Sequence, residues 1–225
     1  YSFSDDNRIY IYDTVVEPDS LEFEPNKARS ELLSEMEDDN DGVTVITTER
    51  LSGNWYSGGY DAKEIADRLH SMFPQAKILV IIREQKSMLN SVYRQYIRKG
   101  GVRSPRRFFS PREYLSYSGN APPGYGRGPG FSFKLYEYDR IIGYYHQLFS
   151  RENVLAVPLE VLKSDTQMSI DTISEFAGAD TEEEFETDTS RSNVGITPFQ
   201  ARLQRYLNPL MNRDYINDYS IYDTR

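Results

Sequence analysis

The chain has 225 residues, and its 26 Lys and Arg against 35 Asp and Glu give a formal net charge of −9. This length suits one large α/β domain with a sizeable core, and the acidic balance argues against a general nucleic-acid binder or a membrane-surface protein. The absence of Cys excludes disulfides, thiolate catalysis and Cys-based metal sites. No apolar run approaches the roughly 18 residues that a membrane span needs, and the start shows no signal-peptide pattern, so we expect a cytoplasmic protein with no membrane span.

The first 61 residues alternate short apolar segments with acidic and Gly-rich loops. Residues 8–13 alternate as in a short strand, and residues 28–36 carry a helical apolar stripe. Residues 43–46 predict a short buried strand, after which the polar residues 47–50 follow where the strand would leave the sheet. The loop 51–60 is rich in Gly and aromatic residues and could shape the site for an acceptor.

A strand, a turn and a helix are predicted from the middle of the chain. Asp61 is a plausible N-cap for a helix that ends at Phe73 and Pro74. The run of five apolar residues at 78–82 has no alternation, which is typical of a strand buried on both faces of a parallel sheet. From Met88 onward the apolar period changes to that of a helix.

Arg83 and Ser91 are the first candidate site residues. Arg83 stands at the carboxyl end of the 78–82 strand, where open α/β sheets bind ligands, and Ser91 lies eight residues later in the helix. A cation and a hydroxyl beside a positive helix N-terminus suit an anion such as phosphate. The alternative is that Arg83 pairs with a nearby carboxylate and that Ser91 packs among small residues.

The next segment, 101–131, is punctuated by Gly and Pro and predicts a long insertion loop, with a short helix starting near Ser110. It also holds a basic island, which could bind an anionic donor or acceptor or simply balance neighbouring acid. The members of this island are Arg103, Arg106, Arg107 and Arg112.

The later chain returns to alternating elements. We expect a helix over 135–149, a buried strand over 153–157, a helix that ends at Gly178, and a last helix introduced by Thr197 and Pro198. Strands that alternate with helices predict an α/β fold of three layers, with a mostly parallel central sheet flanked by helices. We expect a single domain over 1–225.

Three stretches in this order resemble the sulfotransferase family, in particular its bacterial and carbohydrate-type branch, which has a P-loop-like fold. They are residues 77–99, YDRIIGYYHQLFSRENVLAVPLEVLKSD at 138–165 and ISEFAGAD at 173–180. Residues 149–153 resemble the family's FG-x-E-N turn, and residues 160–162 its E-x-L segment. In that family an Arg at a strand end and a Ser eight residues later hold the 3′-phosphate of the donor, 3′-phosphoadenosine 5′-phosphosulfate (PAPS). The resemblance implies this role for Arg83 and Ser91.

The resemblance implies two further site residues. Glu49, in VITTERLSG, matches the strand end that carries a general base in many sulfotransferases; the alternative is that it pairs with Arg50 or caps a turn. Arg191 lies where the family often supplies a basic, Gly-containing loop to the 3′-phosphate, although a plain helix lead-in fits equally well. His70 and His146 have no ligand spacing, so we expect structural or surface roles for them and no metal.

The expected function is therefore transfer of a sulfonate group from PAPS to a hydroxyl of a carbohydrate or small metabolite, with no nucleic-acid partner. The family's sulfate-binding loop, a Lys-x-Gly-Thr/Ser-Thr-like turn, should precede residue 43, but residues 1–42 contain nothing like it. Three readings stay open: the native chain starts earlier, the donor is held differently, or the protein is a noncatalytic carbohydrate- or protein-binding relative that has lost donor binding.

Overall fold

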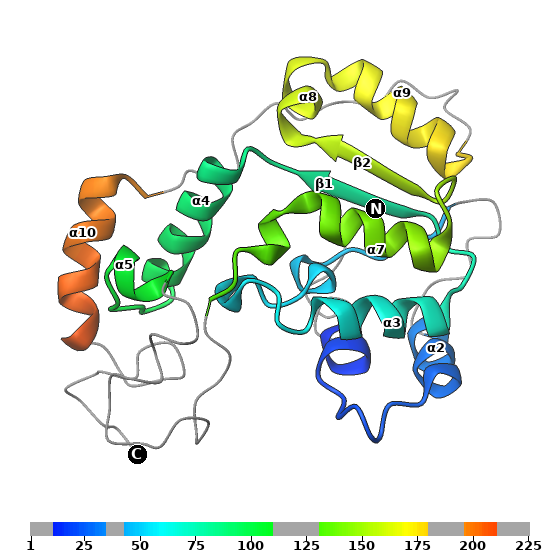
Figure 1. Ribbon diagram of the computed structural model, residues 1–225, viewed down its shortest axis with the longest axis horizontal. Helices are drawn as coiled ribbons and strands as arrows, with labels where there is room; N and C mark the ends of the chain where they lie inside the picture. The colour runs from blue at the N-terminus through cyan, green and yellow to red at the C-terminus, as the bar shows by residue number, and fades with distance from the viewer. Residues whose placement is uncertain (1–10, 35–42, 110–130, 180–195, 211–225) are drawn as a thin grey trace. The chain divides into compact units, whose positions relative to one another are not determined.

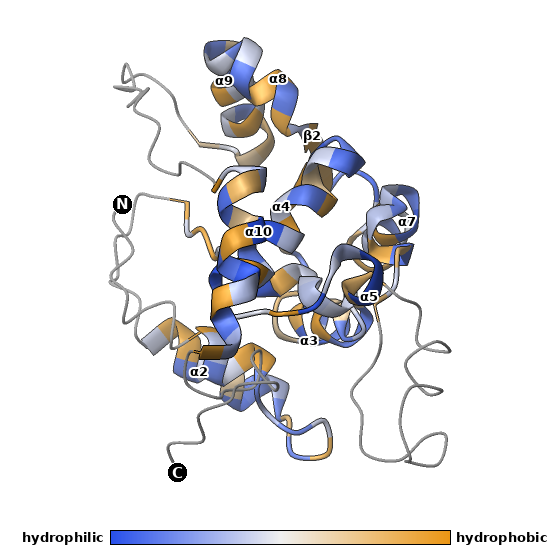
Figure 2. Ribbon diagram, turned by 90° about the vertical axis from the view of Figure 1, so that its left-hand side faces the viewer, coloured by the Kyte–Doolittle hydropathy of each residue, from blue (hydrophilic) through white to orange (hydrophobic). Residues whose placement is uncertain are grey.

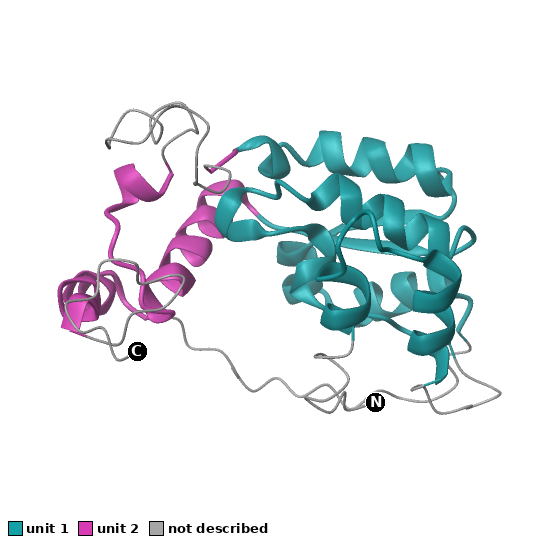
Figure 3. Ribbon diagram, turned by 90° about the horizontal axis from the view of Figure 1, so that it is seen from below, with its two compact units in different colours: residues 1–83, 133–184 teal, residues 84–132, 185–225 magenta. Residues whose placement is uncertain are grey.

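The computed structural model describes residues 11–34, 43–109, 131–179 and 196–210 (Figure 1). The predicted helix start at Ser110, together with Arg112 and Arg191, lies outside these residues. The described part is mixed α/β and mostly helical. The chain divides into two compact units, which we treat separately: the first contains residues 1–83 and 133–184, and the second contains residues 84–132 and 185–225 (Figure 3).

A small parallel sheet forms the centre of the first unit. Strand β1, Ile78–Ile82, pairs with β2, Val154–Pro158, in a register that runs from Ile78 opposite Val154 to Ile82 opposite Pro158. Both strands were predicted, each within one residue of its bounds. The described residues contain these two strands, so the wider three-layer sheet stays a prediction.

Helices cover one face of this sheet. Ile78 and Val80 pack with a buried cluster that includes Ala66 of helix α3, Ala62–Met72, and Tyr145 of helix α7, Tyr138–Phe149. On the opposite face, Leu79 and Ile81 are 39% and 54% exposed. The prediction that this strand is buried on both faces is therefore wrong for the described part of the chain, because the described elements leave β1 open on the second face, although Val157 of β2, opposite Ile81, is buried.

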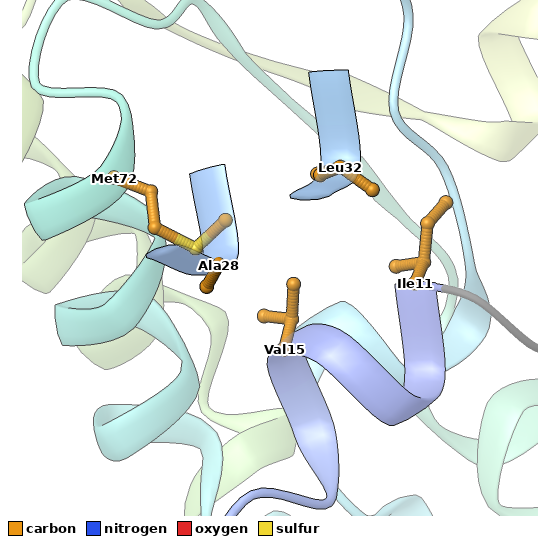
Figure 4. Close-up of a cluster of buried hydrophobic side chains, with 5 residues drawn as sticks. All are labelled: Ile11, Val15, Ala28, Leu32 and Met72. Atoms are coloured by element: carbon orange, nitrogen blue, oxygen red, sulfur yellow. The ribbon is translucent and has the colours of Figure 1, made fainter. Parts of the chain in front are cut away.

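The N-terminal segments of the first unit form a second core (Figure 4). It joins the π-helix η1, Tyr12–Val16, to helix α2, Pro25–Ser34, and to the end of α3. Its fully buried members are Ile11, Val15, Ala28, Leu32 and Met72. Arg68 of α3, itself only 6% exposed, ties the segment after η1 to this core by donating hydrogen bonds to the carbonyls of Val15 and Pro18 at 2.9 and 2.7 Å.

Two of the predicted N-terminal strands are not found. Residues 11–13 of the segment 8–13 are helical, and residues 43–46 form no strand within the described part. Val43 and Val45 are 45% and 59% exposed, and Ile46 packs against the second core instead. An apolar run becomes a strand only where another strand supplies hydrogen-bond partners, and none of the described strands does so here.

The remaining helices of the first unit are mostly short, and among them the sequence predicted the one that ends at Gly178. Short 3₁₀ turns span Glu49–Ser52 (η2), Trp55–Ser57 (η3) and Lys134–Tyr136 (η4), and helices α8 and α9 span Leu159–Ser164 and Thr166–Ala177. Gly178 ends α9 in the left-handed conformation, with φ of 78°, as the sequence predicted. No helix in the described ranges is long and apolar enough to cross a membrane.

The second unit is helical in its described part. It contains α4, Gln85–Arg98; α5, Pro105–Phe108; α10, Pro198–Leu207; and the 3₁₀ turn η5, Asn208–Leu210. Thr197 and Gln200 form the capping box that begins α10, which confirms the predicted helix start. The buried Asn208 amide donates to the carbonyls of Ile97 and Gly101 at 2.9 and 2.7 Å, and so joins α10 to the end of α4.

Candidate functional site

Arg83 follows the last residue of β1, at the carboxyl end of the parallel sheet, as predicted. Its side chain is half-buried, and its guanidinium makes no hydrogen bond or ion pair within the described residues. Its backbone carbonyl accepts a hydrogen bond of 2.7 Å from the hydroxyl of Tyr138, at the start of α7. The strand end is therefore fixed through the backbone, while the cationic side chain stays available to an anion.

Ser91 is an exposed residue of α4 and belongs to the second unit, whereas Arg83 belongs to the first. The N-terminus of α4 differs from the expectation of an open anion site. The carboxylate of Glu84 accepts hydrogen bonds from the backbone amides of Lys86 and Ser87 at 3.1 and 2.7 Å. Since this N-cap already uses two of the helix's unsatisfied donors, phosphate binding would depend on side chains more than on the helix end.

The turn before α7 connects two elements that carry candidate residues. Two residues before Tyr138, the hydroxyl of Tyr136 donates a hydrogen bond of 3.0 Å to the carbonyl of Trp55, in the aromatic loop. Burial raises the pKa of Tyr136, and electrostatic interaction with Tyr138 raises it further. One turn thus holds both the end of β1 and the loop that follows Glu49.

Asp61 organises that loop from its far end. Its carboxylate accepts a hydrogen bond of 2.7 Å from the Arg50 guanidinium and one of 2.6 Å from the backbone amide of Asn54. The predicted N-cap is correct in position, because α3 begins at the next residue, but the Asp61 side chain makes no capping hydrogen bond. The carboxylate instead stabilises the fold of residues 50–54, where it pairs with a largely buried cation.

Glu49 begins the turn η2 and is exposed. Its carboxylate has no hydrogen-bond or ion-pair partner within the described residues, and the alternative of a pair with Arg50 is not realised, because Arg50 pairs with Asp61. Burial raises the pKa of Tyr56 to about 12, with a smaller contribution from the negative charge of Glu49. Glu49 is therefore an available carboxylate with a neutral phenol near it, which suits the acceptance of a proton.

The two histidines lie at the opposite end of the sheet from Arg83. Both line a shallow depression of about 390 Å³ near the amino ends of β1 and β2, together with Ser150 and Glu152. No group of three or more His, Asp or Glu residues in the described ranges could hold a metal ion. The residues predicted to bind the donor nucleotide, and the predicted general base Glu49, are not among the residues that line this depression.

Ser150 has an unusual backbone in the turn between α7 and β2. Its φ of 68° and ψ of 164° fall in a region that is essentially restricted to Gly. In the FG-x-E-N turn that residues 149–153 resemble, this position is Gly. The backbone at this position therefore has a conformation typical of Gly, although the residue is Ser.

Sequence patterns did not reveal Tyr136 and Tyr138 as anchoring residues. They fall on the predicted helix 135–149, and the partners of their hydroxyls are carbonyls 81 and 55 positions away. The second partner of Asp61, Arg50, lies eleven positions upstream and likewise leaves no periodic signal.

No family model matches the chain, and neither a curated protein nor a solved structure does.

Proposed function

We propose that the chain is a sulfotransferase-like domain that transfers a sulfonate group from PAPS to a hydroxyl of a carbohydrate or small metabolite. The observation that carries the proposal is Arg83: a cation without a partner in the described residues, at the carboxyl end of a parallel strand, with Ser91 eight residues further on. The proposal includes the larger three-layer sheet and a single domain over 1–225.

Arg83 and Ser91 would hold the 3′-phosphate of the donor, and Arg191 would supply a further cation to it. A guanidinium presents several donors in a fixed plane and matches phosphate oxygens better than an ammonium does. The half-buried position of Arg83 supports this role, because reduced solvent screening strengthens its attraction for a phosphate.

Glu49 would act as the general base. In the transfer, the acceptor oxygen forms a new bond to sulfur while the bond between sulfur and the donor's phosphate oxygen breaks. The acceptor proton passes to the Glu49 carboxylate, and 3′-phosphoadenosine 5′-phosphate leaves with the bonding electrons. The assignment is supported by the Glu49 carboxylate, which has no ion-pair partner within the described residues, and by the neutral Tyr56 beside it, since a carboxylate already held by a cation would be a weaker base. No metal takes part in this reaction.

Calorimetric titration with 3′-phosphoadenosine 5′-phosphate tests the donor site. We expect binding that Arg83→Ala weakens by at least about tenfold, as expected for the loss of a charge-assisted contact. The matched control is Arg151→Ala, an exposed cation at the amino end of β2. Undiminished binding by Arg83→Ala, or an equal loss with the control, would contradict the assignment.

The base is tested by turnover with a panel of hydroxyl acceptors. We expect Glu49→Gln to keep its affinity for 3′-phosphoadenosine 5′-phosphate and to lose about a hundredfold or more in kcat, the usual range for general-base removal. Glu152→Gln, an exposed carboxylate at the opposite end of the sheet, should retain turnover. Equal turnover of Glu49→Gln and the unmodified protein would remove Glu49 from the mechanism.

A noncatalytic carbohydrate- or protein-binding relative is the second candidate. The observation that favours it is the lack of a Lys-x-Gly-Thr/Ser-Thr-like sulfate loop in residues 1–42. This candidate predicts that 3′-phosphoadenosine 5′-phosphate fails to bind even to a chain with an intact native N-terminus, so the same titration separates the two.

A further inference from the structure

The two units carry opposite charge, which the net value of −9 conceals. Residues 84–132 and 185–225 contain 14 Lys and Arg against 7 Asp and Glu, whereas residues 1–83 and 133–184 contain 12 against 28. A basic unit within an acidic chain points to an anionic partner for that unit alone.

Several of these cations make no ion pair within the described residues. Five ion pairs between described residues lie in the first unit. In the second unit, six cations make no ion pair or hydrogen bond through their side chains within the described residues: Lys86, Arg94, Arg98, Lys99, Arg107 and Arg202. Within the described residues no ion pair relieves the mutual repulsion of these six cations, and a bound polyanion would relieve it.

The spacing of these residues defines two rows. Arg94 and Arg98 stand one turn apart on α4, and α10 packs against α4 through Asn208. On α10, Phe199, Arg202 and Tyr206 follow at i, i+3 and i+7, so they share one face of the helix. Phe199 and Tyr206 are 75% and 67% exposed, and α10 shows hydrophobic segments in Figure 2.

We infer that the second unit binds an anionic polysaccharide, one that carries carboxylate or sulfate groups along its chain. Arginine planes pair with such groups, and exposed aromatic rings on the same helix face stack against the apolar faces of sugar rings. The choice of a glycan rests on the proposed function, in which this polymer would be the hydroxyl-bearing acceptor. A bilayer or a nucleic-acid duplex presents a broad, dense field of negative charge, which the excess of 16 negative charges on the first unit disfavours.

Binding is measured by microscale thermophoresis of the full chain, without donor, against polygalacturonate, dextran sulfate and neutral dextran. We expect at least one of the two anionic glycans to bind, with an affinity that falls as salt rises, and neutral dextran not to bind. The double variant Arg98→Gln/Arg202→Gln should bind about tenfold more weakly. The matched control Arg151→Gln/Lys163→Gln removes two exposed cations from the first unit and should bind normally.

Poly(U) and vesicles of phosphatidylglycerol and phosphatidylcholine are titrated in parallel. Tighter binding of either than of both anionic glycans would overturn the inference in favour of a nucleic acid or a lipid surface. Absence of glycan binding, or an equal loss in the control variant, would also overturn it. The glycan titrations contain no donor, so their result does not depend on nucleotide binding. A failed titration with 3′-phosphoadenosine 5′-phosphate would therefore refute the proposed reaction and leave the glycan result unchanged.

Discussion

The hydroxyl of Tyr138 donates a hydrogen bond of 2.7 Å to the backbone carbonyl of Arg83. This contact joins the first turn of α7 to the residue that ends β1, 55 positions earlier in the chain. It leaves the guanidinium of Arg83 unoccupied while it restrains the backbone from which that side chain projects. Such supporting contacts help to place a binding side chain precisely. A side chain that is mobile before binding loses conformational entropy when the ligand fixes it, and this loss lowers the affinity.

Tyr138→Phe should therefore weaken 3′-phosphoadenosine 5′-phosphate binding about three- to tenfold while it lowers the free energy of unfolding by about 1 kcal/mol. The matched control is Tyr144→Phe, which removes a hydroxyl that donates to Asp67 from the same helix. The control should lose similar stability and keep its nucleotide affinity. Titration calorimetry and urea unfolding measure the two effects, and equal nucleotide affinity in both variants would show that Tyr138 has no positioning role.

A second prediction concerns the Arg50–Asp61 ion pair, which stabilises the loop after Glu49. The Asp61 side chain is 10% exposed and that of Arg50 is 20% exposed, so removal of the carboxylate leaves a largely desolvated cation. Asp61→Ala should lower the free energy of unfolding by about 2–4 kcal/mol. It should also increase hydrogen exchange in residues 50–57, because the amide of Asn54 loses its acceptor.

Glu31→Ala provides the comparison for this ion pair. Glu31 pairs with Lys27 at 3.9 Å, and both side chains are well exposed. Its removal should change stability by less than about 0.5 kcal/mol. A similar loss in Glu31→Ala and Asp61→Ala would mean that burial of the Arg50–Asp61 pair contributes nothing.

Local patterns in the sequence were sufficient for most elements of the fold. The β-branched run at 78–82 and the caps at Thr197 and Gly178 each depend on neighbouring residues, and the structure contains them as predicted. Residues 43–46 have a similar apolar pattern but form no strand, because a strand also needs a partner that the local sequence does not specify. Non-local pairing was the main source of error in the predicted fold.

The candidate site was predictable in a similar, limited way. Sequence placed Arg83 at a strand end, and the structure agrees. It also placed Glu49 at the end of a strand over 43–46, which is wrong for the described residues, because Glu49 begins the turn η2 and no strand precedes it there. It did not indicate that Glu84 would occupy amides at the start of α4, or that Tyr138 would hold Arg83, since each depends on side-chain orientation. The opposite charges of the two units were visible in the sequence, but only after the unit boundaries were known.

At Ser150 we expect a substitution that stabilises the protein. Its backbone lies in a region where a Cβ atom is strained, and Gly removes that strain. Ser150→Gly should raise the free energy of unfolding by about 1 kcal/mol. Ser174→Gly, inside helix α9, should instead lower it by about 0.5 kcal/mol. Chemical unfolding compares the two, and a destabilising Ser150→Gly would argue that the turn has no Gly-like strain.

The raised pKa of a buried tyrosine determines how the free energy of unfolding should change at alkaline pH. Burial raises the pKa of Tyr145 from 10.0 to about 12. An unfolded chain loses this proton near pH 10, whereas the folded chain keeps it until about pH 12. Between these values the unfolded state binds fewer protons, so the stabilising contribution is complete below pH 10 and is lost as the pH rises toward 12.

The free energy of unfolding should therefore fall above pH 10, and Tyr145 should contribute up to about 1.4 kcal/mol for each pH unit. Tyr145→Phe has no phenol to ionise, so its unfolding free energy should fall less steeply by that amount between pH 10 and 12. Within the described residues the Tyr145 hydroxyl makes one long hydrogen bond, 3.5 Å to the carbonyl of Leu51, so the variant should fold normally. Urea unfolding at half-unit pH steps measures both slopes, and parallel slopes in the two proteins would contradict the assigned pKa.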